Sequence, residues 1–296
     1  MAFIRPDLLK KSLKYLSVIQ PKILYVSIDG PRNKYDESLV EQCRVIALNP
    51  GWDCEIVPLF RDNNIGLVQS FVQSMEKMFS EHEFGIFLED DVLLSPTFLK
   101  FAEEIFLKYR NDNRVGHINA SNFIEDFQEP SSYSYFFSEY THVWGFGTWR
   151  RMWKKYDLNM KAWKSLDQKK LLNKHAFSVR ERKNIKKMFD LHCENTDPWA
   201  CDYQWQFNLL KNQSLAVTPS VNMSLNIGFE REDSTHTKGQ NPMASPLGQC
   251  SFPLKHPSVI ERSRVYDKRL ANKMCPSYCS VYFNKIVNKV NPFSYI

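Results

Sequence analysis

The stretch FGIFLEDDV, residues 84–92, decides how the chain is interpreted. Five residues without charge end abruptly in three carboxylates, Glu89, Asp90 and Asp91. An apolar run bounded in this way is typical of a buried strand. Three adjacent acids repel one another unless a cation or a donor-rich ligand lies beside them, and open α/β sheets bind ligands at the carboxyl ends of their strands. The stretch therefore predicts a metal and phosphate site, although acid runs in general more often form solvated surface loops.

Length and composition describe an ordinary globular chain with a mild positive charge. The 296 residues, 43% hydrophobic and 24% charged, suffice for one large domain or for a domain with an appendage. A net charge of +6 suits an anionic substrate or an anionic membrane surface. It is too small and too dispersed to predict a nucleic-acid partner. No apolar run approaches the roughly 20 residues of a membrane span, and no secretory signal is visible.

Cysteine usage favours a reducing compartment. Seven cysteines, an odd number, have the spacing of neither a disulfide framework nor a zinc site. We expect free thiols and a cytoplasmic protein.

Upstream of the acids, strand-like runs alternate with helical patterns. The chain begins with a basic, partly amphipathic helix, which docks on the domain or lies on a membrane surface. Strands are then expected at residues 22–28 and 54–60, each followed by a helix, at 35–47 and 68–79. This alternation predicts a parallel sheet with crossover helices. Because parallel strands end on the same side, the polar loops after the strands are expected beside Asp90 and Asp91, bringing in Asp29, Arg32, Arg61 and Asn64. Surface ion pairs are the competing interpretation for the two arginines.

Downstream of the acids the pattern is less regular. Ser95 and Pro96 predict a helix N-cap and first position, and strands are expected at residues 115–119, 135–137 and 215–217. A strand or turn at 142–149 leads into a basic helix. The Lys-rich segment 161–195 predicts exposed helices or an ordered, solvated insertion. Asp197-Pro198 predicts a helix start that places Asp202 in the early turns.

Three parts are therefore expected. They are an N-terminal basic helix (1–20), a catalytic domain (21–240) that includes the 161–195 insertion, and an irregular segment with a basic-aromatic tail (241–296). The tail suits a membrane surface, so peripheral contact at the inner face of a membrane is a further expectation.

The run FGIFLEDDVLLSPTFLKF resembles the metal-binding segment of GT-A-fold glycosyltransferases, which use nucleotide sugars, and is most similar to the N-acetylglucosaminyltransferase I type. The likeness extends to VWGFGTWRRMWKKYD and DPWACDYQW, and to NIGFEREDSTHT, which resembles a segment of bacterial glycosyltransferases of polysaccharide assembly. It covers roughly residues 20–240. The resemblance implies an α/β, Rossmann-like fold with a mostly parallel central sheet flanked by helices; a basic helical tail would follow it.

The resemblance also implies roles for the acids and the loops. Asp91 would ligate Mn²⁺ or Mg²⁺, and Glu89 and Asp90 would face the nucleotide sugar. Asp29 and Arg32, helped by Arg61 and Asn64, would contact the base and the diphosphate. His236 is the candidate second metal ligand, with an ordinary surface histidine as the alternative.

Acceptor chemistry is assigned to the second half of the chain. Asp202 is the candidate general base of an inverting transfer, although an Asp early in a helix is also favoured by the positive helix end. Trp144, Gly145 and Trp149 resemble the acceptor side of the same enzymes, with core packing as the alternative.

We therefore expect a metal-dependent transfer of sugar from a nucleotide-diphosphate donor to a hydroxyl of a glycan or lipid-linked acceptor. Two alternatives stay open. One is another metal-dependent enzyme on a phosphate substrate, such as a nucleotidyltransferase or phosphohydrolase, and the other is a non-catalytic carbohydrate-binding protein.

Overall fold

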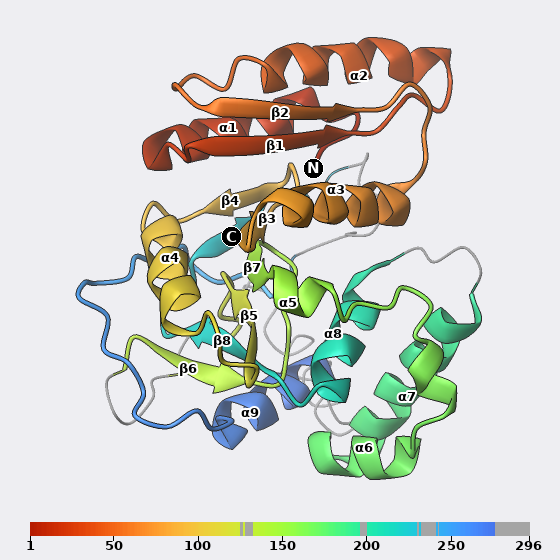
Figure 1. Cartoon of the computed structure of the whole chain (residues 1–296), viewed down its shortest axis with the longest axis vertical. Coiled ribbons are helices and arrows are strands. Elements are labelled where there is room, and N and C mark those ends of the chain that lie inside the picture. The colour runs from red at the N-terminus through yellow and green to blue at the C-terminus, as the bar shows by residue number, and fades with distance from the viewer. Residues whose placement is uncertain are drawn as a thin grey trace, which may run out of the picture.

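The acidic stretch contributes strand β3, Phe84–Phe87, to a mixed central sheet in the computed structural model of the chain (Figure 1). The structure describes residues 1–124, 127, 133–195, 200–229, 231, 241 and 243–275. Helices and strands alternate through this part of the chain, so the fold is α/β as expected. The central sheet has five strands in the order β3-β7-β5-β8-β6, the last four being Phe146–Trp149, Val115–Asn119, Leu215–Pro219 and Tyr135–Ser138.

The expected mostly parallel sheet is not confirmed. Strands β5 and β8 pair in parallel, but β7 runs against both β3 and β5, and β6 runs against β8. Parallel neighbours need a long crossover connection, usually a helix. Among the described residues no helix lies between β5 and β7 in the sequence. Strands β6 and β7, which follow β5 without such a crossover helix in the described chain, pair antiparallel with their neighbours in the sheet.

The N-terminal residues join a second, smaller sheet to the central one. Strand β1 (Ile23–Ile28) pairs in parallel with β2 (Glu55–Phe60), as predicted. Ala2 forms a parallel bridge to Ile28, with its nitrogen donating to the Ser27 carbonyl at 2.9 Å. The Met1 nitrogen donates to the Leu88 carbonyl at 2.7 Å, directly after β3. The carboxyl ends of β1 and β3 therefore meet across residues 1 and 2.

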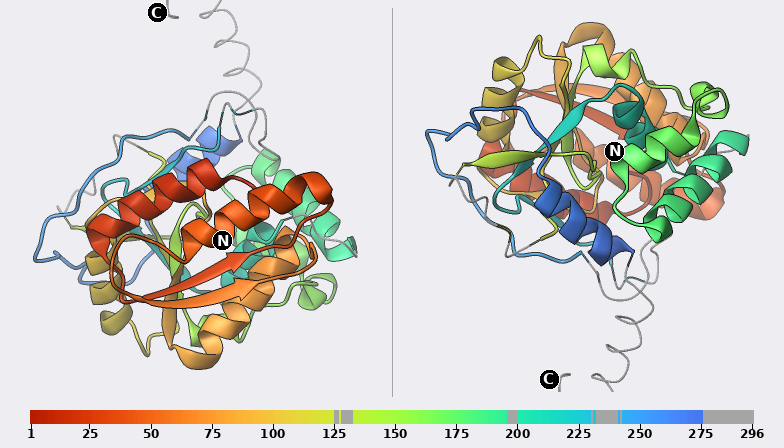
Figure 2. Two further views of the ribbon diagram at one scale, coloured as in Figure 1. Left: turned by 90° about the horizontal axis from the view of Figure 1, so that it is seen from above. Right: turned by 90° about the horizontal axis from the view of Figure 1, so that it is seen from below.

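The predicted N-terminal helix is α1, Pro6–Ile19. Its buried face, which includes Leu9, Leu13 and Leu16, packs into the main core, and α1 lies beside α2 in the view from above (Figure 2). Docking on the domain is thus the observed fate of this helix. The other helices around the sheets are α2 (Lys34–Ala47), α3 (Leu67–Glu81), α4 (Phe98–Lys108), α5 (Arg150–Trp153) and α8 (Asp202–Lys211).

The segment after the acids differs from the prediction. Val92–Leu94 form strand β4, which pairs antiparallel with β9, Ser224–Asn226. Helix α4 begins only at Phe98, with Thr97 as its N-cap, so the N-cap prediction for Ser95 is wrong. The Ser95 backbone instead extends the β4–β9 pair, because its nitrogen donates to the Met223 carbonyl at 2.9 Å.

The Lys-rich insertion is helical, but it has a buried side. It forms a 3₁₀ turn η1 (Lys161–Lys164) and helices α6 (Gln168–His175) and α7 (Val179–Glu194). Trp163, Leu172 and Phe189 form an apolar cluster with Phe207 and Leu210 of α8. The expectation of a solvated insertion therefore holds for its lysines and not for its inner face.

The C-terminal part contains helix α9, Arg264–Met274, which packs against β6 through Tyr266 and Leu270. The basic tail from residue 276 onward lies outside the described residues. No helix within the described ranges is long and apolar enough to cross a membrane. The six described cysteines are all free thiols, as predicted.

Two buried histidines lie behind the carboxyl edge of the sheet. His117 on β5 stacks on Phe146 at 4.9 Å between ring centroids, and its Nδ1 accepts a hydrogen bond from Trp205 at 2.9 Å. The His117 Nε2 is 3.2 Å from the His142 carbonyl, and His142 Nδ1 is 3.0 Å from the Ser121 carbonyl. Burial lowers the pKa of His117 to about 3 and the pKa of His142 to about 4. Both imidazoles are therefore neutral in the folded protein at pH 7.

Replacing His142 by Phe is expected to weaken the pH dependence of stability. The unfolded chain binds a proton at this position with a pKa near 6.5, whereas the folded chain does so only near 4. Stability is therefore lost as the pH falls through this window, and between pH 7 and pH 5 this imidazole accounts for about 2 kcal/mol. Because other groups also titrate there, the measurement is a difference in urea unfolding free energy. The wild type should lose about 2 kcal/mol more than His142→Phe.

The control for this prediction is Phe123→Leu, which removes the ring stacked on His142 at 4.2 Å but keeps the imidazole. Its destabilisation relative to wild type should be the same at both pH values. A His142→Phe variant with an equally constant difference would contradict the buried, neutral histidine.

Candidate functional site

The acidic residues form the turn between β3 and β4, at the carboxyl edge that the sequence predicted. The Val92 nitrogen donates to the Glu89 carbonyl at 3.2 Å and closes the turn. Asp90 and Asp91 are only 4% and 6% exposed. Burying a carboxylate is costly unless it is paired and hydrogen-bonded, so the surroundings of these two residues determine what the site can do.

Arg5 is the cation that the structure places against the acid pair. Its Nη1 donates to Asp91 Oδ2 at 2.9 Å, and its Nε donates to Asp90 Oδ2 at 3.3 Å. Its Nη2 is paired with Asp90 Oδ1. Sequence reasoning missed this residue because it included Arg5 in a basic helix. The signal was present in AFIRPD, residues 2–7, where an apolar run meets a polar residue and a helix-starting proline.

The acid turn has three carboxylates and two cationic groups close enough to act on them, Arg5 and the Met1 amino group. Burial raises the pKa of Glu89 above its ordinary value, and the charges of Asp91 and Asp90 raise it further. Burial also raises the pKa of Asp90, although the Arg5 guanidinium opposes that change. A further cation at this turn would stabilise the ionised carboxylates.

Asp91 has one carboxylate oxygen left for such a cation. Its Oδ2 accepts from Arg5, whereas its Oδ1 is buried and has no hydrogen-bond partner among the described residues. The loop after β9 lies against it, since the Ile227 nitrogen donates to the Asp91 carbonyl at 2.8 Å. A Cβ built on Gly228 would be 2.2 Å from Asp91 Oδ2, so a side chain there would displace the carboxylate. The structure thus brings the segment NIGF, residues 226–229, to the acids.

This geometry fits a metal ion held by few protein ligands. Mg²⁺ typically binds proteins through one or two carboxylates, and substrate phosphates and water complete its coordination. Asp91 Oδ1 is the atom that suits this role. In the described ranges no group of three or more His, Cys, Asp or Glu side chains is arranged to hold a metal. The predicted second ligand, His236, lies outside the described residues.

Asp29, Arg61 and Asn64, predicted to bind the nucleotide, lie in the loops directly after β1 and β2. Their hydrogen bonds connect the loop after β1 to the loop after β2. Asp29 accepts hydrogen bonds from the backbone nitrogens of residues 30, 65 and 66, each within 3.0 Å. Asn64 donates to the Gly30 carbonyl at 3.1 Å. Arg61 donates to the Ser27 hydroxyl at 2.8 Å. These contacts give the residues a structural role, and direct contact with a nucleotide stays a prediction for them.

Arg32 forms an ion pair at the surface, which was the competing interpretation for this residue. Its Nε is 2.7 Å from Asp36 Oδ2 in the first turn of α2, and its side chain is 50% exposed. Its guanidinium also lies 4.9 Å from the centroid of the Phe3 ring. Arg32 is therefore next to the N-terminal segment, at the rim of the site.

Asp202 is the first residue of α8, and the helix is anchored on the central sheet near the acid turn. Trp205 of this helix packs against Phe146 at 5.9 Å between ring centroids. Burial raises the pKa of the Cys201 thiol, and the charges of both Asp202 and Glu89 contribute to that shift. The start of α8 is thus electrostatically coupled to the acid turn. Trp199, expected to flank Asp202, lies outside the described residues.

Two of the predicted acceptor-side residues lie near the acids. The Trp144 ring meets Phe229 edge-on at 5.5 Å and Phe123 at 5.0 Å, so three chain segments form one aromatic wall beside Gly228. Gly145 has φ +76°, and a Cβ there would be 3.0 Å from Leu94 of β4. Sequence reasoning named neither Phe123 nor Phe229 for this wall.

Trp149 belongs to the core instead. It is 2% exposed, and its Nε1 donates to the Phe106 carbonyl at 3.2 Å. Core packing, the alternative interpretation, accounts for this residue.

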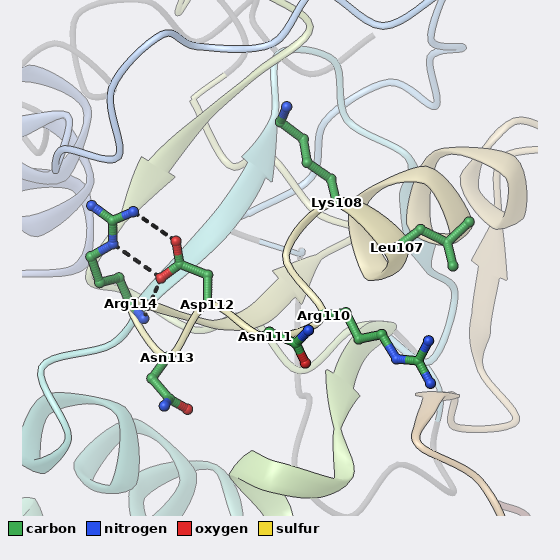
Figure 3. Close-up of a pocket in the computed structure, with 7 residues that line it drawn as sticks. All are labelled: Leu107, Lys108, Arg110, Asn111, Asp112, Asn113 and Arg114. Atoms are coloured by element: carbon green, nitrogen blue, oxygen red, sulfur yellow. Dashed lines mark hydrogen bonds and ion pairs between the residues drawn. The ribbon is translucent and has the colours of Figure 1, made fainter.

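A hollow on the described surface lies elsewhere. It has a volume of about 460 Å³ and is lined by the last two residues of α4, Leu107 and Lys108, and by residues 110–114 before β5 (Figure 3). Because β3 and β5 run in the same direction, the start of β5 is at the opposite edge from the acid turn. The hollow is bounded by an exposed ion pair between Arg114 and Asp112 at 2.7 Å.

The candidate site therefore consists of the acid turn, Arg5, the loop 226–229, the start of α8 and the aromatic wall. No protein-family model matches the chain, and no curated protein matches it either.

Proposed function

We propose that the protein is a metal-dependent glycosyltransferase that moves a sugar from a nucleotide-diphosphate donor to a hydroxyl of a glycan or lipid-linked acceptor. The observation that carries the proposal is the buried Asp91 Oδ1, which lacks a partner in the described chain and lies at a carboxyl edge beside an aromatic wall. The resemblance of the acid segment to GT-A-fold enzymes of the N-acetylglucosaminyltransferase I type agrees with it.

The acid turn would bind the donor's diphosphate end. Asp91 is the residue that would hold Mn²⁺ or Mg²⁺, and a bound cation would supply charge neutralisation for the departing diphosphate. Asp90, fixed by two contacts to Arg5, would orient the nucleotide sugar through its remaining lone pairs. Gly228 keeps the space around the Asp91 carboxylate clear.

Asp202 would accept the proton of the acceptor hydroxyl. A general base is required because a neutral hydroxyl is a weak nucleophile, and a single displacement with one base inverts the anomeric centre. Its position at the beginning of α8 places it in the field of the helix N-terminus, which favours the carboxylate form. The charges of Asp202 and Glu89 both add to the raised pKa of Cys201, the residue directly before α8.

The aromatic wall distinguishes this proposal from other phosphate chemistry. Trp144, Phe229 and Phe123 are each partly exposed and lie beside the loop that contacts Asp91. Flat aromatic faces suit the apolar face of a sugar ring, whereas a phosphohydrolase has no need of them. A lipid-linked acceptor would bring the protein to a membrane surface, for which the basic residues beyond 275 are the candidate contact.

Neutralising Asp91 or Asp202 should separate metal binding from catalysis. We expect Asp91→Asn to lose Mn²⁺-dependent nucleotide release with every donor of a nucleotide-sugar panel. Asp202→Asn should still bind donor and Mn²⁺ but lose transfer by about 10²- to 10⁴-fold, the usual contribution of a general base. Nucleotide release is followed with Mn²⁺ or with EDTA, and Asp112→Asn at the opposite edge is the control. Absence of metal-dependent release with every donor in the wild type would sink the proposal.

Gly228→Ala should weaken Mn²⁺ binding while the protein stays folded. The added methyl would meet Asp91 Oδ2 at 2.2 Å, so the carboxylate must move. Free Mn²⁺ is measured by electron paramagnetic resonance during titration, with circular dichroism as the check on folding. Gly248→Ala is the matched control, because its Cβ would meet nothing nearer than 3.2 Å. Unchanged Mn²⁺ affinity in Gly228→Ala would argue against Asp91 as the ligand.

Removing a ring from the aromatic wall should affect the acceptor and not the donor. For Trp144→Ala and for Phe229→Ala we expect the acceptor KM to rise about 3- to 10-fold, equivalent to about 0.5–1.5 kcal/mol of ring contact. The donor KM and the rate of donor hydrolysis without acceptor should stay near the wild-type values. Tyr35→Ala, which removes an exposed ring on α2, is the control. Equal changes in donor and acceptor KM would mean that the wall only supports the acid turn.

A further inference from the structure

Arg5 has donor capacity that its contacts with the acid pair leave unused. A guanidinium has five N–H groups. Two of those in Arg5 bond Asp90, through Nε and Nη2, and one bonds Asp91 through Nη1. One N–H therefore remains on each terminal nitrogen. No other contact of Arg5 takes these hydrogens in the described chain, and 21% of the side chain is exposed at the acid edge.

The backbone holds Arg5 firmly in this position. Residues 1 and 2 are bonded to β1 on one side and to the Leu88 carbonyl on the other. Pro6 then begins α1, whose leucines are buried in the main core. The backbone is therefore held on both sides of Arg5, and both aspartates hold its guanidinium. Because the side chain is already ordered, binding a ligand costs little of its conformational entropy.

Charge determines which ligand these hydrogens suit. Guanidinium N–H pairs bind carboxylate and phosphate oxygens in parallel, and such charge-assisted bonds are about twice as strong as neutral ones. The three carboxylates of residues 89–91 outnumber the two cationic groups that act on them, Arg5 and the Met1 amino group, and this excess negative charge repels an anion. A divalent cation on the free Asp91 Oδ1 would reverse the sign of the local charge. Phosphate binding by Arg5 should therefore depend on the metal.

We propose that Arg5 binds the donor's diphosphate directly when Asp91 holds a metal ion. This inference rests on the proposed function and adds to it a residue from the N-terminal segment. Arg5 then has two simultaneous tasks: it holds the aspartates in place with three N–H groups and receives phosphate oxygens with the other two.

The test measures Mn²⁺ and inorganic pyrophosphate binding separately. Calorimetric titrations use the full chain as wild type, Arg5→Lys, Arg5→Ala and Arg114→Ala. Arg114 is the matched control, because it pairs with an aspartate at the opposite edge (Figure 3). In the wild type, pyrophosphate should bind with saturating Mn²⁺ and not with EDTA. Arg5→Lys and Arg5→Ala should weaken that binding about tenfold or more, the usual value of charged hydrogen bonds. Arg114→Ala should leave it unchanged.

Mn²⁺ affinity separates a ligand role from a structural one. Removing a positive charge 2.9 Å from Asp91 should leave Mn²⁺ binding equal to or tighter than in the wild type. Parallel loss of Mn²⁺ and pyrophosphate binding in both Arg5 variants would overturn the inference, since Arg5 would then only support the acid turn. Unchanged pyrophosphate binding in Arg5→Ala would overturn it as well.

The two proposals fail in different ways. If wild-type protein releases nucleotide from a sugar donor but Arg5→Ala binds pyrophosphate normally, the glycosyltransferase stands and the role of Arg5 falls. If the wild type binds pyrophosphate through Arg5 but releases nucleotide from no donor, the diphosphate site stands and the glycosyltransferase falls.

Discussion

The pairing of Arg5 with Asp90 and Asp91 is the interaction on which the rest of the site depends. Two adjacent carboxylates with 4% and 6% exposure would otherwise protonate or force the turn into solvent. The Arg5 guanidinium donates three N–H groups to them, and the Met1 amino group adds a second positive charge nearby. One carboxylate oxygen, Asp91 Oδ1, has no hydrogen-bond partner in the described chain. The turn is therefore ordered before any ligand arrives, and it still has one strong acceptor to offer.

This pairing also ties the two halves of the fold together. The small sheet β1–β2 and the central sheet have no direct strand pairing with each other. Residues 1 and 2 connect their carboxyl ends through backbone hydrogen bonds, and Arg5 continues the connection through its side chain. Loss of the Arg5 contacts would therefore weaken the junction between the two sheets. A lysine in this position would keep the charge but could not reach both carboxylates with a rigid fork.

Local patterns in the sequence were enough to predict most elements, while the pairing of distant segments was not predictable from them. The strand before the acids, the alternation upstream and the positions of Asp90 and Asp91 follow from hydrophobic periodicity and from an abrupt change in charge. The antiparallel insertion of β7 between β3 and β5 depends on contacts between residues about 60 positions apart, which periodicity does not encode. The role of Arg5 is hidden for the same reason, because its partners are 85 and 86 residues away. Trp149 and Trp144 belong to one motif in the sequence, and only burial in the fold distinguishes the core residue from the one at the site.

Strand β9 positions the loop 226–229, which lies against the acid turn. Its pairing with β4 sets Asn226 opposite Val92, one residue after the acids. The loop that follows must then pass over Asp91, and glycine is required at 228 because any side chain would occupy the space of the carboxylate. Phe229, the next residue, is thereby directed to Trp144 and completes the aromatic wall. One short antiparallel pair therefore determines both the close approach of Gly228 to the Asp91 carboxylate and the position of the Phe229 ring against Trp144, so both sides of the candidate site depend on the same few hydrogen bonds.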